Sequence, residues 1–227
     1  MIDMLETARH RRAVLKNGLV LTGALAIPSA VSAAGRPQLE GMKLPSVPVP
    51  ARPMTSPRVV RPELLRRAMA SLDSHGSRVV RRDRIAIADF AAPSSQPRFH
   101  LIDLENGSST SMLVAHGSGS DPSHSGWLQR FSNDPGSNAS CEGAFVADDY
   151  YVGKHGRSQR LIGLDPTNCN ALERAIVVHA AWYSNPDMLK THGMLGRSQG
   201  CFAVGDVDLP RLFDRLGPGR MIYATKI

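Results

Sequence analysis

Apolar residues recur in short runs along most of the chain, and polar or turn-forming residues separate the runs. The runs that we predict to be strands cover residues 85–90, 98–104, 109–117, 144–153, 159–164, 174–181 and 220–227. Turn signals between them include Pro93, Asn106-Gly107, Asp134-Pro135-Gly136 and Asp165-Pro166. Asn-Gly is typical of a tight hairpin, because both residues accept positive backbone φ. Many short strands predict a β-sandwich or barrel of mostly antiparallel strands.

Two segments are predicted to be helical instead. Residues 62–77 place Leu64, Leu65, Ala68, Met69 and Leu72 on one face, with proline near the start and glycine near the end. Residues 206–217 read as a short helix that begins at an aspartate and closes at a glycine. We therefore expect a mainly β domain with a few short helices, preceded by one longer helix.

The first 34 residues have the organisation of an export signal. A basic stretch with the pair Arg11-Arg12 precedes a short apolar run that ends in small residues at Ala33 and Ala34. The arginine pair is typical of the twin-arginine class. The apolar run is shorter than the roughly 20 residues that span a bilayer, so no stable membrane span is expected after signal removal. The alternative, a buried N-terminal helix, leaves the arginine pair unexplained.

Residues 35–61 are rich in proline, which favours extended backbone and predicts a linker. Such a segment serves either as a spacer within a polymer network or as a flexible leader without a role of its own. The sequence does not separate these alternatives.

Composition narrows the class of partner. The chain has 227 residues, 42% of them hydrophobic and 21% charged, which suits a monomeric globular domain with a sizeable core. Its net charge is +7, and residues 35–227 hold 23 basic and 18 acidic side chains. A basic body favours an anionic partner. No run of Lys and Arg is interleaved with aromatic residues, so we do not expect nucleic acid.

The stretch GRSQGCFAV contains Cys201, one of three cysteines. A thiol that follows Gly200 can be presented at a sharp loop-to-strand corner, but a lone cysteine is more often a small core residue. A nucleophile needs a base, and a thiolate–imidazolium pair would supply one. His179 ends the apolar run AIVVHAA, 22 positions earlier. His192 is a rival base only nine positions away, in a glycine-rich loop. Spacing alone leaves both the core and the nucleophile interpretation open.

Ordered segments of the chain resemble a known family. HGMLGRSQGCFAV is similar to the active-site loop of the murein L,D-transpeptidase (YkuD-type) family, in the branch with a GRxGRSxGC loop. VVRRDRIAIADF, RFHLIDLENG, LVAHGSGS, FSNDPGSNASCEGAF, YYVGKHGRSQRLIGLDPTN and RAIVVHAAWYS follow the same branch in order. The resemblance spans roughly residues 79–204 and implies a YkuD-like β-sandwich or barrel over residues 78–227.

The resemblance also implies roles for individual residues. Cys201 becomes the acylated nucleophile and His179 the base and acid. Ser198 and Gly200 shape the turn and the oxyanion hole, and Arg197 contacts a substrate carboxylate.

The sequence offers weaker signals for the remaining candidate site residues, which are polar or aromatic. His192 is either a mobile substrate contact or a plain surface residue, and Tyr151 and Asn133 are expected to line the donor cleft. His116 and His155 each precede a glycine and read as turn formers.

Cys141 and Cys169 can form a disulfide in an exported protein, leaving Cys201 free. Folding in a reducing cytoplasm before twin-arginine export argues against that bridge. His179, His192 and the cysteines lack the close ligand pairing of structural zinc sites, and we expect neither a metal nor another cofactor.

Together these observations predict an exported cysteine acyltransferase of the periplasm or cell envelope. Its substrates would be peptidoglycan stem peptides, with an amine acceptor giving L,D-transpeptidation and water giving L,D-carboxypeptidation. The alternative is a catalytically silent cell-wall-binding module of the same fold. Ala180, in place of the usual glycine, and Phe202, in place of proline, motivate that alternative.

Overall fold

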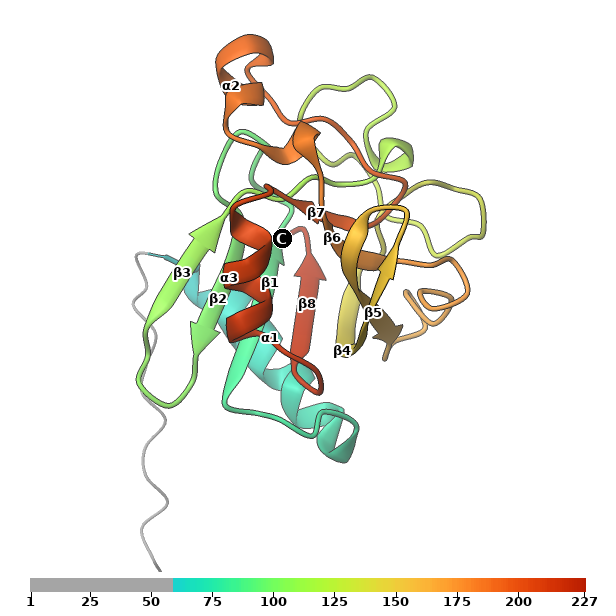
Figure 1. Ribbon diagram of the computed structural model, residues 1–227. Helices are drawn as coiled ribbons and strands as arrows, with labels where there is room; N and C mark the ends of the chain where they lie inside the picture. The colour runs from blue at the N-terminus through green and yellow to red at the C-terminus, as the bar shows by residue number, and fades with distance from the viewer. Residues whose placement is uncertain (1–58) are drawn as a thin grey trace, which may run out of the picture. The chain divides into compact units, whose positions relative to one another are not determined.

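One eight-stranded sheet runs through residues 59–227, the part of the chain that the computed structural model describes (Figure 1). Its strand order is β3-β2-β1-β8-β4-β5-β6-β7. The strands are β1 Arg84–Asp89, β2 Phe99–Asp103, β3 Ser109–Met112, β4 Gly143–Gly153, β5 Gly156–Gly163, β6 Val177–Ala180, β7 Phe202–Val204 and β8 Met221–Thr225. Neighbours are antiparallel except for β1–β8 and β6–β7. The prediction of a mainly β, mostly antiparallel fold is confirmed.

The two ends of the sheet meet. Beyond the last residue of β3, the Ala115 N–H donates to the Ala203 carbonyl of β7 at 2.8 Å. Gly117 forms a further isolated bridge to Ser198. The sheet therefore curls around an apolar core, as expected of a barrel-like fold. Phe202 lies in that core, its ring centroid 5.4 Å from that of Phe145 and 6.0 Å from that of Phe99.

Two helices cover opposite sides of the sheet. Helix α1, Pro62–Ser74, buries Leu64, Ala68 and Leu72 against the face of β1 and β8 that carries Ile85, Ile87 and Met221. Helix α3, Asp208–Arg215, packs Leu209, Leu212 and Phe213 into the core on the other face. Alternate residues of β1 thus enter different clusters, as the two-residue period of a strand requires.

The helix predictions hold with small shifts in bounds. Helix α1 ends at Ser74, and a 3₁₀ turn at Gly76–Arg78 follows it. Helix α2, Asp187–His192, was not predicted. Shorter 3₁₀ turns lie at Ser118–Ser120 and Trp182–Ser184. None of the helices described is long and apolar enough to cross a membrane.

The packed domain begins before the predicted helix. Val60 is 3% exposed and belongs to the cluster under α1, and the Arg61 guanidinium bonds the Asp89 carboxylate at 2.8 Å. The last residues of the predicted linker, 59–61, are therefore part of the domain. The export signal and the remainder of the linker lie outside the described residues.

Candidate active site

The predicted base lies on strand β6, and the predicted nucleophile directly precedes the adjacent strand β7. In the parallel pair β6–β7, His179 is opposite Ala203 and Val178 is opposite Phe202. Val178 and Phe202 face the apolar core, so the alternate positions, His179 and Cys201, face the other way. Both line one cavity of about 610 Å³. Residues 22 positions apart in the sequence are thus brought to the same cavity.

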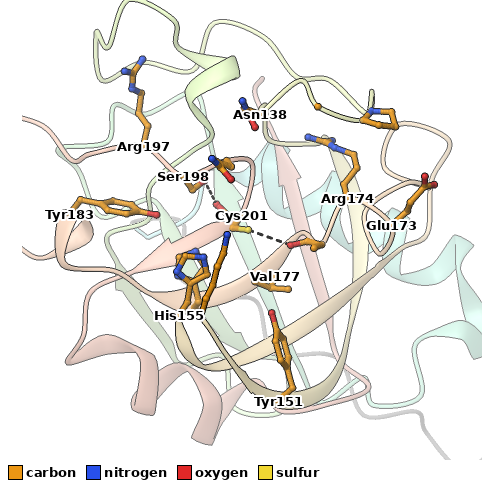
Figure 2. Close-up of a pocket in the computed structure, with 16 residues that line it drawn as sticks. Asn138, Tyr151, His155, Glu173, Arg174, Val177, Tyr183, Arg197, Ser198 and Cys201 are labelled. Atoms are coloured by element: carbon orange, nitrogen blue, oxygen red, sulfur yellow. Dashed lines mark hydrogen bonds between the residues drawn. The ribbon is translucent and has the colours of Figure 1, made fainter.

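The Cys201 thiol is at the floor of this cavity (Figure 2). It donates to the Ala175 carbonyl at a sulfur–oxygen distance of 3.6 Å. Burial raises the pKa of the Cys201 thiol, and the Val177 N–H opposes that effect. Ala175 has φ of +52°, an uncommon backbone angle for a residue with a Cβ, and this angle aims its carbonyl at the sulfur. The resting sulfur is therefore a protonated thiol.

His179 is held as a neutral imidazole. Its side chain is 1% exposed, and Nδ1 lies 2.8 Å from the Ala180 carbonyl oxygen. A carbonyl only accepts, so Nδ1 carries the hydrogen and Nε2 keeps a lone pair. Burial lowers the pKa of His179, and the Ala180 carbonyl opposes that effect. No hydrogen bond joins His179 to the Cys201 sulfur in the described structure. The expected thiolate–imidazolium pair is thus not the resting state.

Ser198 and Gly200 build the turn that presents the cysteine. Ser198 Oγ donates to the Cys201 carbonyl at 2.7 Å and accepts the Gly200 N–H at 3.1 Å. Gly200 has φ of +110°, and a Cβ there would lie 2.7 Å from the Ala139 carbonyl oxygen, so only glycine fits. The turn-shaping part of their expected role agrees with these contacts. The Gly200 N–H is already used inside the turn, whereas the Cys201 N–H has no acceptor among the described residues.

A buried polar network supports this turn from below. The His116 carbonyl accepts the Ser198 N–H at 2.9 Å. The buried Arg98 guanidinium donates to His116 Nδ1 at 2.7 Å, which leaves Nε2–H to donate to Asp121 at 3.3 Å. Burial, together with the charge of Arg98, lowers the pKa of His116 to about 4. His116 is therefore a neutral bridge beneath the site, a role that its place before a glycine did not reveal.

Two of the four predicted substrate contacts, Tyr151 and Arg197, line the cavity. Tyr151 lines the cavity, with the Arg160 guanidinium 4.2 Å from its ring centroid. Arg197 also lines it, but its guanidinium donates to two backbone carbonyls, those of Asp121 and Pro122, and points away from Cys201 (Figure 2). These contacts hold the loop at residues 121–122, so the Arg197 guanidinium is not free to bind a carboxylate.

Two predicted contacts lie outside the cavity. The Asn133 amide donates to the Pro166 carbonyl at 3.1 Å and to the Cys169 sulfur at 3.2 Å. His192 is the exposed last residue of helix α2. Neither residue lines the cavity that contains Cys201 and His179.

Sequence reasoning missed several residues of the cavity wall. The His155 ring stacks on the His179 ring, with centroids 4.2 Å apart and planes inclined by 22°. Lys154 precedes it at the tip of the β4–β5 hairpin and lines the same cavity. The Tyr183 hydroxyl is directed toward Cys201 (Figure 2), and burial raises its pKa to about 12. The hairpin is visible in the sequence, but its position over β6 depends on pairing between distant strands.

All three cysteines are free. The Cys141 sulfur is buried and accepts from Arg174 Nη1 at 2.7 Å, whereas Cys169 is exposed. The disulfide considered from the sequence is therefore absent from this structure. Residues 59–227 contain no group of three or more His, Cys, Asp or Glu side chains placed to hold a metal ion.

The domain is a curled, mainly antiparallel sheet in which a cysteine and a histidine line the same cavity. The sequence model of the L,D-transpeptidase catalytic domain family matches residues 57–225. The chain belongs to this family, whose members act on peptidoglycan. No curated protein matches it.

The chain is also similar to solved structures of L,D-transpeptidases, at low identity. One from Mycobacterium smegmatis has 14% identity and a TM-score of 0.39 over 63% of this chain and 58% of that chain. One from Mycobacterium tuberculosis H37Rv has 13% identity and a TM-score of 0.41, over 63% and 58%. L,D-transpeptidase 3 from Mycobacterium tuberculosis has 13% identity and a TM-score of 0.41, over 63% and 61%. The chain thus covers less than two thirds of the length of these proteins.

Proposed function

We propose that this chain is an exported cysteine acyltransferase that acts on peptidoglycan stem peptides through a thioester at Cys201. One observation carries the proposal: Cys201, which directly precedes strand β7, and His179 of the adjacent strand β6 line one open cavity, within an L,D-transpeptidase catalytic domain. The groups needed for nucleophilic catalysis are a thiol, a base and an oxyanion donor, and the cavity has a candidate for each.

The first half-reaction follows from the resting protonation states. His179 Nε2 takes the thiol proton as the sulfur attacks the carbonyl carbon before a terminal D-residue. The Cys201 N–H, which has no other described acceptor, donates to the developing oxyanion. The C–N bond then breaks, and His179 returns the proton to the leaving amine. The released D-amino acid leaves a thioester on Cys201.

The second half-reaction runs the same proton path in reverse order. An acceptor amine or a water molecule attacks the thioester, and His179 removes its proton. The sulfur leaves and is reprotonated, which restores the thiol. An amine of a neighbouring stem gives a cross-link, whereas water gives a trimmed stem.

The departures from the family pattern leave these groups in place. Ala180 acts on His179 through its backbone carbonyl, which any residue supplies. Phe202 is 1% exposed and fills the core between Phe99 and Phe145, so its side chain points away from the cavity. Neither substitution removes a reacting group, which favours the enzyme over a silent module.

Export completes the proposal. Residues 1–34 would direct the chain across the membrane by the twin-arginine route, and the proline-rich residues after them would join the signal to the domain. This placement would bring the domain to its polymeric substrate.

Product analysis tests this function. Purified protein is incubated with tetrapeptide muropeptides, and the products are separated by liquid chromatography and identified by mass spectrometry. We expect a released D-amino acid together with cross-linked dimers, trimmed stems or both, and no product from Cys201→Ala. Folded, reduced wild-type protein that leaves every muropeptide unchanged would overturn the proposal.

A further inference from the structure

The tip of the β4–β5 hairpin reaches the reacting groups. His155 at this tip, labelled in Figure 2, stacks on His179. The two ring centroids are 4.2 Å apart. Lys154 is the preceding residue, is exposed, and lines the same cavity as Cys201 and His179. The stack thus fixes the hairpin tip, and the lysine with it, at the edge of the site.

Lys154 differs from the other cations of the cavity wall. Arg174 donates to the Ser132 carbonyl at 2.7 Å and the Ala139 carbonyl at 2.6 Å. Arg197 is likewise committed to backbone carbonyls. Lys154 forms no hydrogen bond or ion pair with any described residue. Of the Lys and Arg side chains that line the cavity, it alone is thus available to a ligand within the described structure.

The electrostatic influence of Lys154 agrees with this position. Its charge acts to lower the pKa of the Cys201 thiol, against the larger effect of burial. It also contributes to the lowered pKa of His179, after burial and the charge of His155. The ammonium is therefore within electrostatic range of both reacting groups. Glu173, the carboxylate of the cavity, lies on the Arg174 side of the site (Figure 2).

We propose that Lys154 forms a carboxylate subsite that holds the terminal carboxylate of the substrate's leaving residue beside Cys201. This inference rests on the proposed function, in which the scissile amide is one residue from a free chain end. That carboxylate lies a few ångströms from the attacked carbonyl, and a lysine on a flexible stem binds it as a point charge. The subsite makes the enzyme select chain ends, and Lys154 takes the carboxylate contact that the family resemblance implied for Arg197.

The test pairs two donor peptides with four proteins. The donors are identical tetrapeptides that end in a free carboxylate or in a carboxamide. The proteins are wild type, Lys154→Met, Lys154→Arg and Lys190→Met. Lys190 is paired with Asp187 on helix α2 and does not line the cavity, so its variant is the control for net charge.

We expect wild type and Lys190→Met to prefer the carboxylate donor by about 10- to 100-fold in kcat/KM. Lys154→Met loses that preference by becoming slower on the carboxylate donor alone, and Lys154→Arg keeps most of it. An equal loss of kcat/KM on both donors would mean that Lys154 acts on the Cys201 thiol and not on the substrate carboxylate. That result would overturn the subsite. Unchanged kinetics in Lys154→Met would overturn it as well.

Binding to unreactive protein separates this inference from the proposed function. In the Cys201→Ala background, calorimetry compares the same two peptides with and without Lys154→Met. Tighter binding of the carboxylate peptide that disappears with Lys154→Met supports the subsite, even if wild type forms no product. Equal binding of the two peptides by folded protein overturns the subsite, even if wild type is an active transferase.

Discussion

His179 Nδ1 lies 2.8 Å from the carbonyl oxygen of Ala180, the next residue in the chain. This contact assigns the hydrogen to Nδ1 and leaves Nε2 as the basic atom. Burial of both reacting side chains disfavours their charged forms, so the free site holds a thiol and a neutral imidazole. The nucleophile is therefore generated by proton transfer during attack.

The first prediction concerns the reactivity of the free thiol. Because the pKa of Cys201 is raised, alkylation by iodoacetamide should accelerate with pH and reach half its maximum above the usual thiol value of about 8.5. Mass spectrometry of the Cys201 peptide after timed alkylation measures this, with glutathione as the reference thiol. A rate that is already maximal below pH 7 would show a resting thiolate–imidazolium pair instead.

The second prediction concerns the stacked His155 ring, which we assign as a positioning residue. Burial lowers the pKa of His179 most, and the charge of His155 contributes. Removal of the ring in His155→Ala exposes the imidazole, so the acidic limb of the kcat/KM profile should move to higher pH. His155→Phe keeps a flat ring over His179 and should stay closer to wild type. Coincident acidic limbs for the three proteins would contradict this role.

The third prediction concerns the turn before the cysteine. Ser198→Ala removes the bond to the Cys201 carbonyl and leaves the buried Gly200 N–H without its acceptor. We expect a loss of about 1–3 kcal/mol in the free energy of unfolding, measured by urea denaturation, and a fall in kcat of tenfold or more. Ser74→Ala, at an exposed serine on α1, serves as the control and should cost less than about 0.5 kcal/mol. Equal effects of the two substitutions would argue against this account of the turn.

The fourth prediction follows from the buried His116. Its pKa is lowered from 6.5 to about 4 in the folded state, so the unfolded state takes up a proton first as the pH falls. The stability that depends on neutral His116 is complete above pH 6.5 and is lost as the pH falls through 4. The loss is on the order of 3 kcal/mol.

Urea unfolding at several pH values between 7 and 4 measures this dependence. His116→Gln is less stable at pH 7 but should lose less stability across the window. Parallel pH dependences for the two proteins would exclude His116 as the source.

The sequence predicted the local elements well, because their signals are local. Asn106-Gly107 predicted the β2–β3 hairpin, and Gly107 has the positive φ that this turn needs. Helix α3 was predicted from its end residues, although its N-cap is Val207 and not the expected aspartate. Strand β7 has only three residues, too few for a pattern to separate it from the loop before it. The closure of the sheet through Ala115 and Ala203 has no local signal.

The site was predicted in part for the same reason. His179 lies near the end of β6, within a run that the sequence predicted to be a strand, whereas Cys201 directly precedes β7, which it did not predict. His155 and Lys154 read as hairpin residues, and only the pairing of β5 with β6 brings their turn over His179. Asn133 and His192 lie outside the cavity, which the sequence did not show, because polarity in a loop does not reveal which atoms the side chain bonds.

The central claim is that Cys201 is the residue that becomes acylated, and intact-protein mass spectrometry after exposure to a carbapenem tests it most directly. The account predicts one covalent adduct on wild type, mapped to the Cys201 peptide, and none on Cys201→Ala, which retains Cys141 and Cys169. Folded, reduced wild-type protein without an adduct, or an adduct that persists in Cys201→Ala, would contradict it.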